Sequence, residues 1–540
     1  MPQRVLPLAL ILFGSMIATA APPSQHADVV VYGSTSGGVM ASVQAARQGK
    51  SVLLVSTNGR LGGLTSSGLG KTDILYPETL GGLNAEFYQR VSTYYDNPEN
   101  WFCSKRKKWN PNSSWGKEDI QGIMLNFEPH VAEELFNQFV AEQPNIQVIS
   151  GERLNRSIDV LKQEGVIQEI EMESGLKLTG KIFLDCTYEG DLMDAAGVSF
   201  TVGREANSKY NETANGIQLD STKHQFPPGI SPYVIADDPT SGLLPNILPH
   251  PPGKTGDGDN RIQAYCFRLC LTDNVDNRLP FRKPDGYQRH DYTLLKRLME
   301  RGVFSNLGNS GAMPNCKTDT NNHGPFSSDF IGMNHNWPLA SYAERDEIYQ
   351  AHKDYQMGMW YYLTADPETP AAFREKYSDW GLAKDEFQST GGWPHELYVR
   401  EGRRMLGRLV MTEKHCQLKE SVDDPIARGG YNMDSHHNSR YVTADGDVRN
   451  EGDVQNRSGA YEISYRAITP KSDECRNLLV PVCLSASHIA YGSIRMEPVF
   501  MYLGQSAGSA AALSIDHECS VQSLDYSKLS KQLVDNGQLN

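Results

Sequence analysis

Apolar and polar positions are arranged most regularly near the start of the chain, where they predict a strand, a helix and a second strand. Residues 28–32 (DVVVY) form an apolar run with the length of a buried strand. A glycine-rich turn at residues 33–38 follows at once, and small apolar residues then continue as a helix that ends near Gly49. Residues 51–55 (SVLLV) form the second strand. This order within about 30 residues is typical of a dinucleotide-binding unit.

The glycine-rich turn has the composition that a diphosphate site requires. Gly33 can adopt backbone torsions that other residues avoid, and Gly38 allows the helix to pass close to the strand. The diphosphate would rest on free N–H groups at the positive end of the helix. The middle glycine of the G-x-G-x-x-G pattern is replaced by a threonine. The predicted cofactor contacts are Gly33, Thr35, Ser36, Gly37 and Gly38.

Two features after the second strand concern the same site. The acidic residue that binds the adenosine ribose in such units is absent, and Ser56 occupies its place. A hydroxyl binds a ribose less strongly than a carboxylate does. Residues 59–68 (GRLGGLTSSG) then bring paired glycines, which let the backbone approach a flat ligand, and an arginine that can neutralise phosphate. We therefore add Ser56, Arg60, Gly62, Gly63 and Leu64 to the predicted cofactor residues; a flexible surface loop is the alternative for residues 59–68.

The segments VVVYGSTSGGVMASVQAARQGKSVLLV and GRLGGLTSSGLGKTD resemble the FAD-dependent oxidoreductase family, whose fold is similar to the glutathione-reductase type of flavoprotein. The resemblance implies FAD as the cofactor. Residues 145–184 read as a meander of short strands that ends in residues 185–192 (DCTYEGDL). This turn resembles the family's second cofactor segment and implies cofactor contacts for Thr187 and Asp191, although Tyr188 stands where a glycine is more usual. A cap on a helix over 192–196 is the alternative role for Asp191.

A third segment near the end of the chain also resembles the family. Residues 478–484 predict a strand, 485–498 a loop, and 499–515 a helix with one face of small residues. In the family, the last helix points its N-terminus at the flavin, where its N–H groups would stabilise negative charge. The resemblance implies cofactor contacts for Arg495, Gly504 and Gln505 and a site role for His488. An ordinary helix packed on a sheet explains the small residues equally well.

The three segments together predict an α/β fold, in which a Rossmann-like FAD-binding domain is interrupted by a large mixed α+β substrate domain. The predicted boundaries are 27–203 for the first part of the FAD-binding domain, 204–476 for the insertion, and 477–520 for the C-terminal segment. Within the insertion, residues 264–272 alternate as a strand that places Arg268 on either a cavity face or a surface face. Residues 340–363 predict one long helix whose aromatic residues belong to the core.

The segment at residues 390–406 predicts a helix that begins at Pro394 and carries His395 on its apolar face. Glu396 and Arg400 would form an i,i+4 pair, and Arg403 would face solvent. The segment also resembles the family, which implies site roles for His395, Tyr398 and Arg400. His436 and its neighbour His437 lie in a predicted polar loop without a carboxylate or cysteine at ligand spacing, so we predict no metal.

Composition and the N-terminus bound the setting in which the protein acts. The chain has 540 residues and a formal net charge of −14, which argues against a nucleic-acid partner. Arg4, an apolar run at residues 6–17 and small residues at 18–20 predict a signal peptide over residues 1–20. We therefore expect a secreted or periplasmic protein with no membrane span after cleavage; a retained anchor is the alternative. The nine cysteines are an odd number, so at least one is free or pairs between chains.

These predictions point to an oxidoreductase that transfers a hydride from a small polar substrate, such as a sugar or another hydroxylated compound, to flavin N5. A histidine would serve as the base, and the candidates are His395, His436 and His488. The electron acceptor, oxygen or a redox partner, stays open. One alternative is a redox-neutral flavin-containing lyase or hydratase. Another is a non-catalytic carbohydrate-binding protein with a decayed nucleotide fold.

Overall fold

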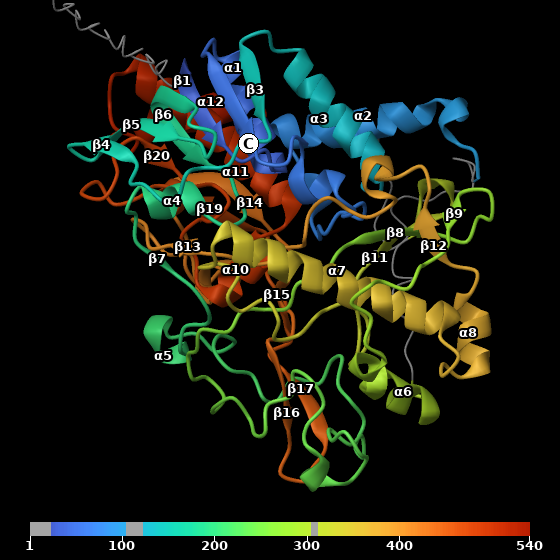
Figure 1. Cartoon of the computed structure of the whole chain (residues 1–540). Coiled ribbons are helices and arrows are strands. Elements are labelled where there is room, and N and C mark those ends of the chain that lie inside the picture. The colour runs from blue at the N-terminus through green and yellow to red at the C-terminus, as the bar shows by residue number, and fades with distance from the viewer. Residues whose placement is uncertain (1–22, 104–121, 304–311, 540) are drawn as a thin grey trace, which may run out of the picture.

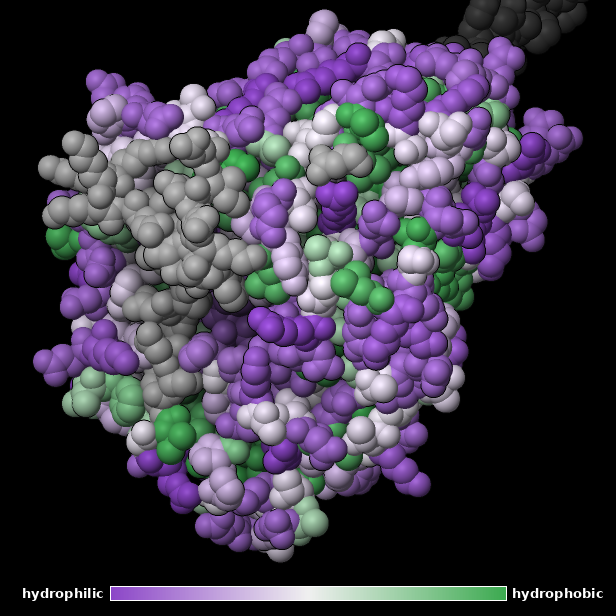
Figure 2. Space-filling model, turned by 180° about the vertical axis from the view of Figure 1, so that it is seen from behind, coloured by the Kyte–Doolittle hydropathy of each residue, from purple (hydrophilic) through white to green (hydrophobic). Residues whose placement is uncertain are grey.

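The computed structural model describes residues 23–103, 122–303 and 312–539 (Figure 1). The predicted signal peptide at residues 1–20 lies outside these ranges. Among the helices that are described, none combines the length and the apolar character needed to cross a bilayer. The face of the molecule in Figure 2 is mainly hydrophilic and carries only separate hydrophobic patches, as expected for a chain with a globular composition.

The N-terminal part of the chain folds around a seven-stranded sheet. Its strands lie in the order β3-β2-β1-β6-β5-β4, and β20 also pairs with β6. The pairs β1–β2, β2–β3, β1–β6 and β6–β20 are parallel, whereas β4 and β5 run antiparallel to their neighbours. The bounds are Ser24–Tyr32 (β1), Val52–Ser56 (β2), Ile146–Ser150 (β3), Leu161–Gln163 (β4), Val166–Glu171 (β5), Lys177–Asp185 (β6) and Leu478–Leu479 (β20). The predicted α/β class is confirmed.

Two helices from opposite ends of the chain pack against each other beside this sheet. They are α1 (Ser36–Arg47) and α11 (Glu497–Asp516). A Cβ on Gly504 would lie 2.0 Å from the backbone oxygen of Gly37, so only glycine permits this approach. The helices α2 (Gly82–Asp96), α3 (Pro129–Ala141) and α12 (Tyr526–Asp535) complete this part. The small-residue face of α11 therefore packs against α1.

The middle of the chain forms a mixed insertion whose main sheet has five strands, in the order β10-β11-β8-β12-β9. The bounds are Ala312–Met313 (β10), Lys317–Thr320 (β11), Leu269–Thr272 (β8), Gly381–Ala383 (β12) and Arg278–Leu279 (β9). The helix α7 (Tyr342–Ala365) crosses the middle of the molecule in Figure 1, close to the predicted position. Further helices are α4 (Asp191–Ala195), α5 (Asn207–Tyr210), α6 (Thr293–Glu300), α8 (Ala371–Tyr377) and α9 (Glu413–Cys416).

Short strand pairs surround these two sheets. They are β7 (Phe200–Thr201) with β13 (Arg404–Met405), β14 (Pro425–Gly429) with β19 (Tyr461–Ser464), β15 (Met433–Ser435) with β18 (Val454–Asn456), and β16 (Ser439–Val442) with β17 (Val448–Glu451). One hydrophobic cluster runs from β1 and α11 into the aromatic side chains of the insertion, among them Tyr265 and Trp360. The nucleotide-binding part and the insertion thus share one core.

The predicted helix beginning at Pro394 is wrong. The segment from Gly392 to Arg403 is irregular, with bends and no helix, and it continues into β13. Its arginines are buried, because both sides of the segment meet protein; Arg403 is only 1% exposed and pairs with Asp191 at 2.9 Å. The expected solvent-facing position of Arg403 is therefore also wrong. A helical period does not distinguish a one-sided surface helix from an irregular segment buried on both sides.

Three smaller predictions also need correction. Only Leu269–Thr272 of the expected strand at 264–272 joins the ladder, and the part before it is buried without regular secondary structure. The expected loop at 485–498 contains a helix, α10 (His488–Ile494). Residues 433–435 form β15 rather than a polar loop. All three segments lie in the protein interior, where a polar composition reflects buried hydrogen bonding instead of exposure.

One disulfide joins Cys103 to Cys316, and the other seven cysteines are free. The expectation of at least one free cysteine is confirmed. The disulfide links the chain after α2 to the turn before β11, so it ties the nucleotide-binding part to the insertion.

Candidate active site

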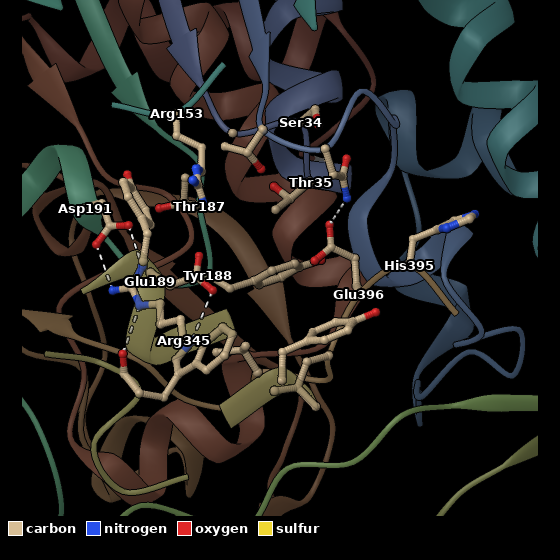
Figure 3. A pocket seen from close by; sticks show the side chains of 18 of the residues that line it. Ser34, Thr35, Arg153, Thr187, Tyr188, Glu189, Asp191, Arg345, His395 and Glu396 are labelled. Atoms are coloured by element: carbon tan, nitrogen blue, oxygen red, sulfur yellow. Dashed lines mark hydrogen bonds and ion pairs between the residues drawn. The ribbon is translucent and has the colours of Figure 1, made fainter. Parts of the chain in front are cut away.

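A cavity of about 250 Å³ lies at the carboxyl ends of β1, β2 and β6 (Figure 3). Ligands bind at this edge in open α/β sheets, because the loops that follow parallel strands meet there. We call this cavity the nucleotide cleft. Its lining includes Gly33, Ser34 and Thr35 after β1, Thr57 and Asn58 after β2, Thr187, Tyr188 and Glu189 after β6, and Trp337, Tyr342, Arg345, His395, Glu396, Leu397 and Val399 from the insertion.

The glycine-rich turn after β1 fits a diphosphate. Gly33 has φ of 103°, and a Cβ there would lie 2.7 Å from the backbone of Cys186. The Thr35 hydroxyl donates to the Cys186 carbonyl at 2.7 Å and accepts from the Gly38 N–H at 3.2 Å, so Thr35 caps α1. The N–H groups in the first turn of α1, such as that of Gly37, have no acceptor within the helix. These free groups at the positive end of a helix suit an anion.

The second glycine-rich segment packs beside the turn after β6. Gly62 and Gly63 have φ of 99° and 54°, and a Cβ on Gly63 would lie 2.4 Å from the Tyr188 hydroxyl. The Leu64 N–H donates to the same hydroxyl at 2.9 Å. Arg60 donates to the Glu133 carboxylate at 2.8 Å, so its charge already has a partner. Gly63 and Leu64 thus contact Tyr188, which lines the cleft, whereas Gly62 packs against Phe136 and Arg60 is held by α3.

Glu497, the first residue of α11, joins the three remote segments in one place. Its buried carboxylate accepts hydrogen bonds from Ser36 at 2.5 Å, Thr65 at 2.7 Å and Tyr188 at 2.8 Å. These donors belong to the turn after β1, the second glycine-rich segment and the turn after β6. The prediction that the three segments converge is confirmed.

Other predicted cofactor residues have partners within the protein. Asp191 follows the N-cap Gly190 and pairs with Arg345 at 2.6 Å at the edge of the cleft, so it does not cap α4. The Thr187 hydroxyl donates to the carboxylate of Asp185 at 2.7 Å. Gln505 accepts from the Leu83 N–H and donates to Gln44, between α11, α2 and α1, and it does not line the nucleotide cleft. Its described contacts indicate packing.

A second group of functional side chains lies deeper, where three guanidinium groups surround the ring of Tyr398. The distances to the ring centre are 5.6 Å for Arg268, 4.6 Å for Arg400 and 5.7 Å for Arg495. We call these four residues the arginine cluster. Arg495 also donates to the Tyr398 hydroxyl at 2.8 Å. Each arginine has an aspartate partner within 2.7 to 2.9 Å: Asp319, Asp329 and Asp434, respectively.

The arginine cluster keeps unused hydrogen-bonding capacity. The Nη1 atom of Arg268 and the Nε atoms of Arg400 and Arg495 are buried and have no acceptor among the described residues. Buried donors without partners are rare in proteins and indicate a place for a ligand or ordered water. The predicted surface alternative for Arg268 is excluded, because Arg268 is only 4% exposed.

Asp73 lies beside this cluster and was missed by the sequence reasoning. Its carboxylate has no hydrogen-bond or ion-pair partner among the described residues. Burial raises the pKa of Asp73, and Asp319 and Asp434 add to the rise while Arg268 opposes it. The available signal was its position at the end of GRLGGLTSSGLGKTD, where a glycine-rich segment ends in a carboxylate.

The three candidate histidines lie in different surroundings. His436 contacts Asp329 at 2.7 Å and Asp434 at 3.4 Å; burial and Arg400 lower its pKa, but these carboxylates outweigh them and raise it overall. His488 contacts Glu401 at 2.7 Å, and burial lowers its pKa to about 3. Only His436 adjoins the arginine cluster.

His395 lines the nucleotide cleft, but its ring points away from the other labelled side chains in Figure 3 and meets the edge of Phe387 at 5.2 Å. Burial lowers the pKa of His395, and Arg60 adds to the effect. None of the described contacts of His395 involves a residue of the arginine cluster.

One group of side chains has the composition of a metal site. Ligand atoms of Glu128, His130 and Glu386 lie within 4.8 Å of one another. The Lys317 ammonium contacts Glu128 at 2.7 Å and Glu386 at 2.6 Å, so a lysine already supplies the positive charge between the carboxylates. This group lies near the disulfide and does not line the nucleotide cleft.

The fold and the cleft define an α/β protein that binds a dinucleotide at the carboxyl edge of its parallel strands. A family model described as FAD dependent oxidoreductase matches residues 28–533. The chain belongs to this family, which assigns FAD as the cofactor and oxidoreductase as the class of enzyme. Family membership disfavours the non-catalytic carbohydrate-binding alternative. No curated protein matches the chain.

Solved structures show weaker similarity. The OxyS anhydrotetracycline hydroxylase from Streptomyces rimosus is 12% identical over 34% of this chain and 36% of that chain, with a TM-score of 0.25. The p-nitrophenol 4-monooxygenase PnpA from Pseudomonas putida DLL-E4 is 12% identical over 34% of this chain and 46% of that chain, with a TM-score of 0.24. The chain thus spans less than half the length of either protein, and likenesses of this size add nothing to the assignment.

Proposed function

We propose that the protein oxidises a small hydroxylated substrate bound at the arginine cluster, with Asp73 as the base. The observation that carries this proposal is the partly buried carboxylate of Asp73, which has no partner among the described residues and lies beside guanidinium groups with unused donors. A substrate that carries hydroxyl groups would satisfy both the donors and the acceptor. The substrate class agrees with the expected sugar or hydroxylated compound.

The chain links the nucleotide cleft to the arginine cluster through one irregular segment. Leu397 and Val399 line the cleft, whereas Tyr398 and Arg400 between and after them belong to the cluster. Because neighbouring residues of this segment belong to the cleft and to the cluster, a single segment can contact ligands at both places. This arrangement supports a substrate site next to the cofactor site.

FAD, when bound, supplies the acceptor for a hydride from the substrate carbon. The carboxylate of Asp73 would accept the proton from the hydroxyl on that carbon, which leaves a carbonyl. A raised pKa brings Asp73 closer to neutral pH, where a base is most effective. The raised pKa of His436 favours its charged form, so His436 would hold negative charge rather than accept a proton. We therefore propose Asp73 as the base, in place of the histidine expected from the sequence.

The test is a screen of sugars, hydroxy acids and amines for loss of the ~450 nm flavin absorbance without oxygen. We expect at least one hydroxylated compound to bleach the flavin. In Asp73→Asn, kcat should fall by about 10²- to 10⁴-fold with unchanged FAD content. Asp276→Asn, at an exposed position, is the matched control. Turnover of a substrate without net bleaching or an external acceptor would instead support the lyase or hydratase alternative.

We also propose that residues 1–20 are a cleaved export signal and that the protein acts outside the cytoplasm. The disulfide between Cys103 and Cys316 supports this setting, because disulfides persist mainly in oxidising compartments. Intact-mass measurement of the protein from its exported fraction should show a chain that begins after residue 20. A full-length mass in the cytoplasmic fraction alone would contradict the proposal.

A further inference from the structure

The strand β2 lacks the acidic residue that binds the adenosine ribose in dinucleotide-binding folds, and Ser56 does not replace it. Ser56 is fully buried. Its hydroxyl donates to the Arg60 carbonyl at 2.7 Å and accepts from the Ser34 hydroxyl at 2.9 Å. Both contacts lie within the protein. The expected bond from Ser56 to the ribose would require these contacts to break.

A different carboxyl group reaches the same end of β2 from the insertion. Glu396 lines the nucleotide cleft together with Ser34, Thr35 and Asn58. Its Oε1 atom accepts a hydrogen bond from Asn58 Nδ2 at 2.6 Å, across 338 residues of sequence. In Figure 3, the Glu396 carboxyl points towards the side of the cleft formed by Ser34 and Thr35.

The position of Glu396 is defined on both sides. Its backbone N–H donates to the Ser67 hydroxyl at 2.8 Å, and Asn58 is itself held by the Arg60 N–H at 2.9 Å. The second carboxyl oxygen, Oε2, has no partner among the described residues. Glu396 therefore presents one free oxygen to the cleft from a fixed position.

We infer that Glu396 binds a hydroxyl group of the adenosine ribose of FAD, in place of the acidic residue that β2 lacks. The carboxyl comes from the insertion and not from the nucleotide-binding unit. The inference rests on the FAD cofactor of the family and not on the proposed substrate.

The electrostatics of the site agree with this role. Burial raises the pKa of Glu396 to about 8, and Glu189 adds to the rise. The group is then uncharged at neutral pH and does not repel the diphosphate that the turn after β1 would hold. A carboxylic acid can both donate to and accept from a ribose hydroxyl.

The experiment measures binding of two ligands to the flavin-free protein, by quenching of flavin fluorescence. The ligands are FAD and an FAD analogue that carries 2′-deoxyadenosine. Wild-type protein should bind the analogue about ten- to hundredfold more weakly, the effect of losing one buried hydrogen bond. Glu396→Ala should bind FAD as weakly as the wild type binds the analogue and should not distinguish the two ligands.

Controls separate this role from general damage to the cleft. Glu396→Gln keeps the size of the side chain and one acceptor, so it should retain part of the discrimination between FAD and the analogue. If circular dichroism shows that Glu396→Ala does not fold, Glu396→Gln is used for the test instead. Asp346→Asn changes an exposed carboxylate at the edge of the same cleft and should discriminate as the wild type does.

The decisive comparison is with Ser56→Ala, which should also retain full discrimination. Loss of discrimination in Ser56→Ala would overturn the inference, as would wild-type discrimination in both Glu396 variants. A wild-type protein that binds both ligands equally would overturn it as well. Since the readout is ligand affinity, the result is independent of whether a substrate is found.

Discussion

Substitution of Glu497 tests whether the three segments of the cofactor site are held together by one carboxylate. In Glu497→Ala, the hydroxyls of Ser36, Thr65 and Tyr188 lose their common acceptor. Each unsatisfied buried hydroxyl costs about 1 kcal/mol. The free energy of unfolding should therefore fall by about 3 kcal/mol, with a further loss from the space left by the side chain.

The conservative variant sharpens this prediction. Glu497→Gln keeps the shape and one oxygen, and a hydroxyl facing the new amide can rotate to accept from it. We expect a loss of only about 1 kcal/mol. Tyr188→Phe removes one of the three donors, so a double-mutant cycle with Glu497→Gln should show a coupling of about 0.5–1 kcal/mol.

Urea unfolding of the flavin-free proteins at pH 7, followed by tryptophan fluorescence, measures these differences. Flavin binding is then titrated in the variants that fold. Equal losses in Glu497→Ala and Glu497→Gln would refute the reasoning, because the effect would then come from the charge and not from the hydroxyl network. A loss below about 1 kcal/mol in Glu497→Ala would refute it too.

Two further predictions concern stability. Burial raises the pKa of Asp185 to about 6, so the folded protein keeps a proton that the unfolded chain releases near pH 4. The stabilising effect of this proton is complete below pH 4 and is lost as the pH rises to 6, by about 3 kcal/mol. The difference in unfolding free energy between the wild type and Asp185→Asn should change by the same amount over this range. A difference that stays constant from pH 4 to 6 would contradict the prediction. Cys103→Ser should lower the unfolding free energy by about 2–5 kcal/mol, because the disulfide closes a long loop. Dithiothreitol should reproduce the loss in the wild type, whereas Cys519→Ser, at a free cysteine, should change the unfolding free energy little. If Cys103→Ser, Cys519→Ser and the reduced wild type were equally stable, the disulfide would be excluded as a stabilising element.

The cofactor-binding unit could be predicted because its signals are local. A short apolar run, a glycine turn and a helix of small residues each follow from neighbouring positions, and Gly33 and α1 lie where the pattern placed them. The helix α7 was predicted for the same reason, since its period and length leave one solution. The convergence of the remote segments followed from the family resemblance, and Glu497 is the physical contact that accomplishes it.

The substrate side was predicted less well because its side chains act through partners far away in the sequence. From the local sequence, Arg403 was expected to face solvent, but in the folded chain it is buried and pairs with Asp191, which is distant in sequence. Glu396 was assigned to a helical ion pair with Arg400, yet Asn58 holds it in the cleft and Asp329 binds Arg400. A buried charge is tolerated only when such a partner is present, and no local pattern contains that information.

The sequence by itself determined the class of fold, because short-range propensities and a glycine pattern suffice for it. The resemblance of its segments to a known family indicated the cofactor and the regions that meet around it. Tertiary structure alone decided that residues 392–403 form no helix, that their side chains reach both the nucleotide cleft and the arginine cluster, and that Asp73 lies beside these arginines without a partner among the described residues. The physical reason is that burial and pairing set the protonation and orientation of these groups, and both depend on residues that approach only when the whole chain has folded.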